Sequence, residues 1–392
     1  MINEKIYVRY DLIGLLLLFM LISLISIYNA EQLEQYEGQN FMLKQAVWFG
    51  LGLTILIFVQ FFDLETIYKL SLACYLVGIL LLIVLHFSPS TIAPAINTAK
   101  SWFKFGGVSF QPSEVTKITT ILYLAAIISK HKAKFESTTV TTDFFLLGKL
   151  ILVGIIPIAF IMMQPDFGTS MVLLSIVIAL IFLSGIRWSI ILSISLTVAI
   201  FIGITVLLVF RYPDIAQSTL NLENYQMDRL ETWLGLSEDS SNSENKTYHF
   251  QKSLLAVSSG QLMGKGIHNL EVYIPEAQTD FIFSIIGESF GFLGCSFVLI
   301  LYFCLIYRLV TLGLKIYHTN YFGAYLCFGY LFLIFIHTFQ NIGMTIGIMP
   351  ITGIPLLLIS YGGSSVLASM IGYALIYKVS CEYQKQEMYL FK

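Results

Sequence analysis

Ten runs of mostly apolar residues follow one another along this 392-residue chain, and each is long enough for a helix that crosses a bilayer. Only helices and closed barrels satisfy their backbone polar groups in hydrocarbon, and the runs lack the alternation of barrel strands. Hydrophobic residues form 57% of the sequence and charged residues 12%, which is typical of integral membrane proteins. We therefore predict an all-α fold, a polytopic membrane helical bundle with about ten transmembrane helices. The runs are 11–28, 45–62, 69–87, 113–130, 144–163, 168–186, 188–210, 281–306, 322–349 and 354–378.

Lys and Arg residues indicate how this bundle is oriented. With the N-terminus inside, most of them fall on the cytoplasmic side, whereas the short outer loops hold only Lys44, Lys100 and Lys104. We therefore expect cytoplasmic N- and C-termini and a large extracellular loop, 211–279, between helices 7 and 8. The first run lacks a convincing cleavage site and is interpreted as an uncleaved anchor. Residues 1–392 are expected to form one integral membrane domain, and the absence of a basic tract argues against a nucleic-acid partner.

Asp280 is the most informative single residue, because it stands where the long polar loop enters the eighth apolar run. An ionised Asp at the middle of a bilayer costs on the order of 3 kcal/mol, so membrane chains keep one mainly where it lines a wet cavity or has a partner. Asp280 is therefore a candidate for chemistry on a substrate that arrives from the membrane.

Other polar segments have both a structural and a functional interpretation. Glu114 and Lys117 lie three residues apart on one helical face, so they form either a structural ion pair or part of a site. Asp166 either caps the helix that follows it or contributes to the site. The stretch 349–365 interrupts an apolar run with Pro and Gly, which suits either substrate binding or a packing hinge. The glycines around Lys265 permit close approach of an anion, but their spacing is not that of a phosphate-binding P-loop.

Taken in order, these segments resemble the SEDS family of bacterial shape, elongation, division and sporulation proteins, which includes RodA, FtsW and SpoVE. The resemblance covers about residues 10 to 380 and is slightly stronger to RodA. The segments that carry it are Trp102, Gln111-Pro112-Ser113-Glu114 with Lys117, Gln164-Pro165-Asp166-Phe167-Gly168, Gly264-Lys265-Gly266, Pro275-Glu276 with Thr279-Asp280-Phe281, and Pro350-Ile351-Thr352-Gly353-Ile354-Pro355 through Ser360-Tyr361-Gly362-Gly363-Ser364.

The resemblance implies a ten-helix peptidoglycan glycosyltransferase of the bacterial cytoplasmic membrane. Such an enzyme polymerises lipid II at the outer face of the membrane, for cell elongation and shape, together with a class B penicillin-binding protein that crosslinks the strands. By the same resemblance Asp280 is the catalytic residue, and Trp102, Glu114, Lys117 and Asp166 match other functional positions.

The residues suit this chemistry independently. Extending a glycan requires a sugar 4-hydroxyl to attack an anomeric carbon while a lipid diphosphate departs, so the reaction needs a base and cations. Asp280 is the candidate base, and Lys117, Lys265 and Arg229 are the candidate diphosphate partners, with Lys117 discounted if Glu114 occupies it fully. A divalent cation, Mg or Mn, can share that task, although no ligand cluster in the sequence requires a metal.

Three alternatives stay open. A flippase or transporter of lipid-linked precursors also shows many spans, broken helices and intramembrane charges, although the sequence contains no visible inverted repeat. A catalytically idle scaffold for a cell-wall synthase is a second alternative, which the presence of Asp280 makes less attractive. The third is a division or sporulation relative, FtsW-like or SpoVE-like, with the same chemistry.

Overall fold

The computed structural model confirms the helical bundle. It describes residues 8–36, 38–95, 99–105, 108–135, 139–211 and 241–390, and within these ranges a helix covers all or most of each predicted apolar run. The helices are α1 (Tyr10–Ala30), the 3-10 turn η1 (Glu34–Tyr36), α2 (Phe41–Val59), α3 (Leu64–Phe87), α4 (Pro112–Lys134), α5 (Val140–Met162), α6 (Phe167–Leu183), α7 (Trp188–Arg211), α10 (Ser241–Ser259), α11 (Ile282–Ile316), α12 (Tyr321–Thr345) and α13 (Gly363–Leu390). Two short antiparallel strands, β1 (Phe103–Phe105) and β2 (Val108–Phe110), form a hairpin before α4.

Seven of the helices in the described part of the chain are long and apolar enough to cross a membrane by length and composition: α1, α2, α3, α5, α11, α12 and α13. The helix α6 is apolar but shorter. The helix α4 carries charged residues at both of its ends, and most of its side chains are buried against neighbouring helices. Because protein shields its polar groups, α4 can occupy the interior of the bundle without exposing them to lipid.

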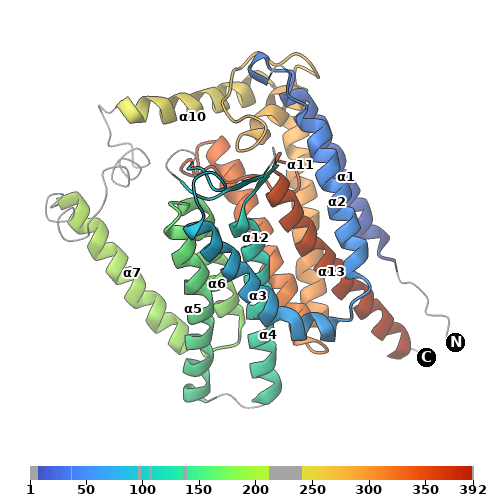
Figure 1. Ribbon diagram of the computed structural model, residues 1–392, viewed down its shortest axis with the longest axis vertical. Helices are drawn as coiled ribbons and strands as arrows, with labels where there is room; N and C mark the ends of the chain where they lie inside the picture. Colours follow the sequence, from blue (N-terminus) through green and yellow to red (C-terminus); the bar gives the residue numbers. More distant parts are fainter. Residues whose placement is uncertain are drawn as a thin grey trace.

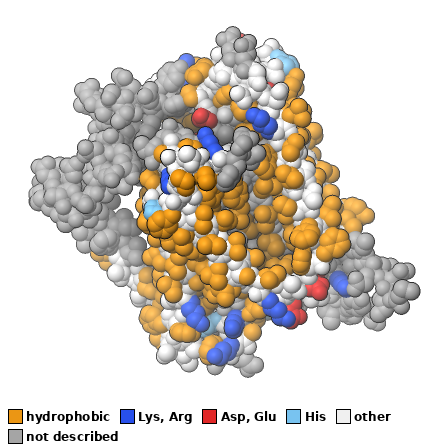
Figure 2. All heavy atoms as spheres, viewed as in Figure 1, with side chains coloured by type: hydrophobic (Ala, Val, Ile, Leu, Met, Phe, Trp, Pro, Cys, Tyr) orange, Lys and Arg blue, Asp and Glu red, His pale blue; other side chains and the backbone are white. Residues whose placement is uncertain are grey.

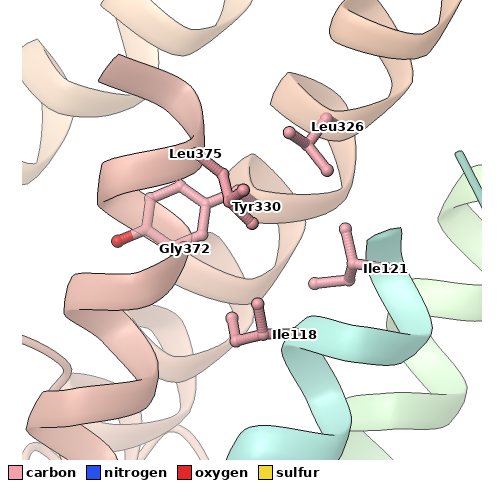
Figure 3. A pocket seen from close by; sticks show the side chains of 6 residues that line it. All are labelled: Ile118, Ile121, Leu326, Tyr330, Gly372 and Leu375. Carbon is pink, nitrogen blue, oxygen red and sulfur yellow. The ribbon is translucent and has the colours of Figure 1, made fainter. Parts of the chain in front are cut away.

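The helix α12 lies at the centre of the bundle and packs against α4, α6, α11 and α13. Close helix contact depends on small residues there, as Figure 3 shows for α4, α12 and α13. The ring of Tyr330 lies beside Gly372, where an added Cβ would meet the ring at 2.4 Å, and the Tyr330 hydroxyl donates to the Ser369 carbonyl at 3.0 Å. Ile118 and Ile121 of α4 complete the contact (Figure 3).

The two ends of the bundle differ. The start of α1, the end of α13, the end of α4 and the start of α5 lie at one end, and the hairpin, α10 and the start of α11 lie at the other (Figure 1). An apolar band separates them, and Lys and Arg side chains gather at the end where α4 ends and α5 begins (Figure 2). This arrangement agrees with termini on one side and the long loop on the other. Which side faces the cytoplasm stays a prediction.

The helix α11 is interrupted at Gly291, whose φ of 61° and ψ of −157° are not helical. The freed backbone groups pair with the segment that follows α10. Lys265 N donates to the Glu288 carbonyl and Gly266 N to the Ser289 carbonyl, both at 2.9 Å, and Phe292 N donates to Gln261 at 2.8 Å. A short, fully packed half-helix therefore precedes the break, and Asp280 stands just before that half-helix begins.

The last apolar run differs from the predicted span 354–378, because α13 begins only at Gly363. Apart from turns, residues 346–362 are not helical, and the chain folds back within the bundle before α13 starts. We call this stretch the broken segment. Its two prolines and several glycines explain why it leaves the helix.

Candidate active site

Asp280 lies between the long loop and α11, where its side chain is partly buried. Burial, and secondly the negative charge of Glu276, raise the pKa of the Asp280 carboxyl to about 7, while a hydrogen bond from Thr279 acts in the opposite direction. A carboxyl group with a pKa near 7 is suited to proton transfer at neutral pH.

The backbone before α11 is held by the C-terminal part of the chain. Three successive carbonyl groups each accept one hydrogen bond from it. Gln278 accepts from Tyr361 N at 2.9 Å, Thr279 from Ser360 Oγ at 2.6 Å, and Asp280 from Asn341 Nδ2 at 2.7 Å. Residues 278–280, which we call the approach to α11, are therefore connected to the broken segment and to α12 by hydrogen bonds.

Side chains from four helices satisfy the carbonyl groups of the broken segment. On α12, Gln340 donates to Pro350, Asn341 to Ile354 and His337 to Pro355, and Tyr302 of α11 donates to Leu357. Ser23 of α1 donates to Ile359 at 2.7 Å and Gln45 of α2 to Ser360 at 3.1 Å. Non-helical backbone at membrane depth is tolerated only when protein or water pairs its polar groups. These donors explain how the broken segment persists inside the bundle.

Asp166 caps α6, which confirms the structural one of its two predicted interpretations. Its carboxylate accepts from Thr169 N at 3.1 Å, from the Thr169 hydroxyl at 2.8 Å and from Gln111 Nε2 at 2.9 Å. The turn at the start of α6, which we call the Asp166 turn, touches the broken segment. A Cβ on Gly168 would lie 3.1 Å from the Thr352 carbonyl oxygen. The cap therefore also fixes the turn next to the Asp280 region.

The hairpin and the residues just before it, which include Trp102, contact this turn. Ser101 Oγ donates to the Gln164 carbonyl at 3.2 Å, and Gln111 N, just after the hairpin, donates to Ser364 Oγ at 2.8 Å. Trp102 itself is half-buried just before β1. The predicted motifs around Trp102, Asp166, the broken segment and Asp280 are thus contiguous in the structure.

Glu114 and Lys117 form the expected ion pair, with Lys117 Nζ 2.9 Å from Glu114 Oε1 and both side chains almost fully buried. The structure adds a third member, because Lys117 Nζ also lies 2.9 Å from His337 Nε2. His337 Nδ1 is 2.9 Å from the Pro355 carbonyl oxygen, which makes Nδ1 the protonated nitrogen and Nε2 the acceptor. The ion pair is thereby connected to the broken segment.

The other two candidate cations are placed differently. Lys265 donates to Glu271 and to the buried Glu288, both at 2.8 Å, so it joins the loop to the half-helix of α11. Arg229 lies outside the described residues. Within the described ranges, no group of three or more His, Cys, Asp or Glu side chains is arranged to hold a metal ion.

Sequence reasoning missed His337 and Asn341, which make the central contacts of the site. A signal was present: His337, Asn341 and Thr345 follow at intervals of four on a helix that is otherwise mostly apolar. Polar side chains in a transmembrane segment usually face the bundle interior, and this spacing places them on one face. Their acceptors on distant segments were not visible in the sequence.

Comparison with known proteins tests the resemblance to a family. The family model described as cell cycle protein, which covers FtsW, RodA and SpoVE, matches residues 5–385. The probable peptidoglycan glycosyltransferase FtsW of Coxiella burnetii is 30% identical over 348 residues, which are 88% of this chain and 87% of that protein. The peptidoglycan glycosyltransferase MrdB of Escherichia coli K12 is 29% identical over 388 residues, which are 96% of each chain.

Solved structures share the fold. A chain from a peptidoglycan synthase complex, described as coordinating polymerization and crosslinking, superposes with a TM-score of 0.74 at 24% identity, over 97% of this chain and 99% of that one. The crystal structure of the rod shape determining protein RodA of Thermus thermophilus gives a TM-score of 0.65 at 24% identity, over 96% of this chain and 97% of that one.

Proposed function

The chain belongs to the family of FtsW, RodA and SpoVE, and from this premise we propose that it polymerises lipid II into glycan strands at the outer face of the cytoplasmic membrane. The chain is a multi-pass protein of the bacterial cell membrane and a peptidoglycan glycosyltransferase. The substrate, the side of the membrane and the residue roles are the parts that we propose.

One observation carries the proposal. Asp280 is partly buried where the approach to α11, the broken segment and the Asp166 turn meet, and its pKa is raised to about 7 by burial and by Glu276. A carboxylate that is held by protein yet accessible at a membrane–loop junction can meet both a lipid-linked substrate and a sugar in water. This placement suits a general base better than a structural carboxylate.

The proposed step is a glycosyl transfer with Asp280 as base. The acceptor 4-hydroxyl oxygen forms a bond to the anomeric carbon of the donor, the bond from that carbon to the diphosphate breaks, and the lipid diphosphate leaves with the electron pair. Asp280 takes the proton of the attacking hydroxyl. The leaving group is already activated, so the step needs no additional acid.

The candidate cations differ in how well they are placed to bind the diphosphate. Lys117 is buried and held by Glu114 and His337, so we assign it a structural role that supports the broken segment. Lys265 is partly exposed although it is paired with two carboxylates, and it stays a candidate together with Arg229. A divalent cation bound with the diphosphate would supply further neutralisation of the leaving group.

Trp102 is proposed to contact the substrate, because it is half-buried and lies between the hairpin and Ser101, whose hydroxyl binds the turn that contains Asp166. We propose a class B penicillin-binding protein as the partner that crosslinks the strands, in line with the peptidoglycan synthase complex whose chain shares this fold. Among relatives named FtsW and MrdB with similar identity, we favour a role in elongation and cell shape. Depletion that yields rounded cells supports elongation, whereas undivided filaments support division.

The test is polymerisation of labelled lipid II by purified protein, with and without a class B penicillin-binding protein, read as glycan strands on a gel. Asp280→Asn keeps the size of the side chain and removes its ability to take a proton, so polymerisation should fall by roughly a hundredfold or more at equal amounts of folded protein. Lipid II binding should change far less. Asp63→Asn is the matched control, because Asp63 is an exposed carboxylate that caps no helix through its side chain.

Two results would count against this function. Near-normal polymerisation by Asp280→Asn eliminates Asp280 as the base. Wild-type protein that makes no strands but moves lipid II across vesicle membranes favours a transporter, with Asp280→Asn altering that movement.

A further inference from the structure

The helix α12 carries a polar face that neither the family match nor the proposed chemistry explains. His337, Asn341 and Thr345 are all buried on this face, and each makes a hydrogen bond. Burying an amide such as that of Asn341 is costly unless its hydrogen bonds are formed. The partners of Asn341 therefore indicate what the residue is kept for.

Asn341 joins two segments that are far apart in the sequence. Its Nδ2 donates to the Asp280 carbonyl at 2.7 Å and to the Ile354 carbonyl at 2.9 Å, and the side chain has no exposed surface. Both amide protons are used, one for each segment. Asn341 thus ties both Asp280 and the Ile354 part of the broken segment to α12 through a single side chain.

The hydrogen bond to Ile354 matters because the preceding residue, Gly353, faces the carboxylate of Asp280. Gly353 adopts a φ of +68°, and a Cβ added to it would lie 3.1 Å from Asp280 Oδ2. Asn341 therefore holds the main chain of Asp280 and, through Ile354, the backbone at Gly353, against which the Asp280 carboxylate lies. We call this backbone the Gly353 wall. A change at Asn341 alters the space in which the carboxylate meets a hydroxyl group.

Other hydrogen bonds hold the residues next to Asp280, but they do not tie these residues to α12. Ser360 Oγ and Tyr361 N bind the carbonyl groups of Thr279 and Gln278, and both donors belong to the broken segment itself. They can move together with the segment. Asn341 is anchored on α12, which is fully helical around it, so it supplies a reference that does not move with either partner.

We propose that Asn341 is a positioning residue for the transfer reaction, which fixes the Asp280 carboxylate relative to the Gly353 wall. This inference rests on the proposed function. Its physical basis is that a base accelerates proton transfer only within hydrogen-bond reach of the attacking hydroxyl, and a misplacement of about 1 Å can cost about a hundredfold in rate.

The test compares Asn341→Leu with Thr345→Val, in purified protein with labelled lipid II and normalised to folded protein. Leu has the same number of side-chain heavy atoms as Asn and the same branching at Cγ, but it donates no hydrogen bond. We therefore expect kcat to fall by about tenfold to a hundredfold while KM changes by less than about twofold. Thr345→Val is the matched control on the same helix face. It removes only the hydrogen bond from Thr345 to the Asn341 carbonyl within α12, and its kcat should stay near the wild-type value.

A second variant guards against misfolding of the first. Asn341→Ala is smaller than Asn and therefore fits the buried site without overpacking, and it donates neither hydrogen bond, so it should show the same selective loss of kcat. A wild-type kcat for both Asn341 variants overturns the positioning role, as does a loss confined to the amount of folded protein. Wild-type protein that forms no glycan strands overturns the proposed function itself, and this result is distinguished by the wild-type lane alone.

Discussion

Replacing Lys117 with Met tests whether the buried charges under the broken segment are structural. The ammonium lies 2.9 Å from Glu114 Oε1 and 2.9 Å from His337 Nε2, and the Lys117 and Glu114 side chains are only 2% and 4% exposed. With Lys117 removed, the Glu114 carboxylate has no opposite charge within its buried site, and His337 loses the donor to its Nε2. A Lys117→Met variant should therefore unfold far more readily than the wild type.

The expected cost follows from burial. Breaking a buried ion pair by removing one partner costs about 3–5 kcal/mol, because the remaining charge is uncompensated. At about 1.4 kcal/mol for each tenfold change, this lowers the ratio of folded to unfolded protein by roughly a hundredfold to several thousandfold. The double variant Lys117→Met with Glu114→Gln removes both charges and should recover part of the loss, since replacing a whole buried pair is often nearly neutral.

The assay is reversible unfolding in detergent, by heat or by increasing denaturing detergent, followed with the same probe for all variants. Lys69→Met is the matched control, because Lys69 lies 2.7 Å from Glu65 in an exposed pair, and exposed pairs contribute little to stability. If Lys117→Met is as stable as the wild type but no longer polymerises lipid II, the structural explanation is refuted and the cation belongs to substrate binding.

The remaining predictions concern the carboxylate, the wall beside it and the loop. Because Asp280 acts as a base only when ionised and its pKa is raised to about 7, the polymerisation rate should rise with pH through about 7 and then level off. Glu276→Gln removes a negative neighbour and should move that midpoint to lower pH, by less than about one unit because Glu276 is exposed; an unchanged profile would contradict the assignment. Gly353→Ala places a methyl group against the Asp280 carboxylate at a positive φ, so polymerisation should fall more than lipid II binding does, which a gel and a binding assay compare. Gly264→Ala drives a Cβ to within 2.2 Å of the α11 main chain and should lower the unfolding midpoint strongly, whereas Gly50→Ala, which meets nothing within 4 Å, should not.

Much of the architecture was predictable because a bilayer imposes simple rules. Helices must form wherever about twenty apolar residues follow one another, and this rule located the helices of the bundle, although α13 begins later than the predicted span 354–378. The Glu114–Lys117 pair was also predictable, since a separation of three residues places both side chains on one helical face. Asp280 stood out because a carboxylate beside a membrane span needs a reason to be there.

The sequence by itself therefore determined the helical bundle, its polar landmarks and the candidate base, because each of these depends on neighbours within a few residues. Only the tertiary structure decided the late start of α13, the partnership of Lys265 with Glu288 and the placement of His337 and Asn341. The deciding contacts join groups that are distant in the chain, such as Ser23 with Ile359 across 336 positions. Buried backbone groups accept whichever donor the packing brings to them, so their partners are fixed only once the helices are assembled.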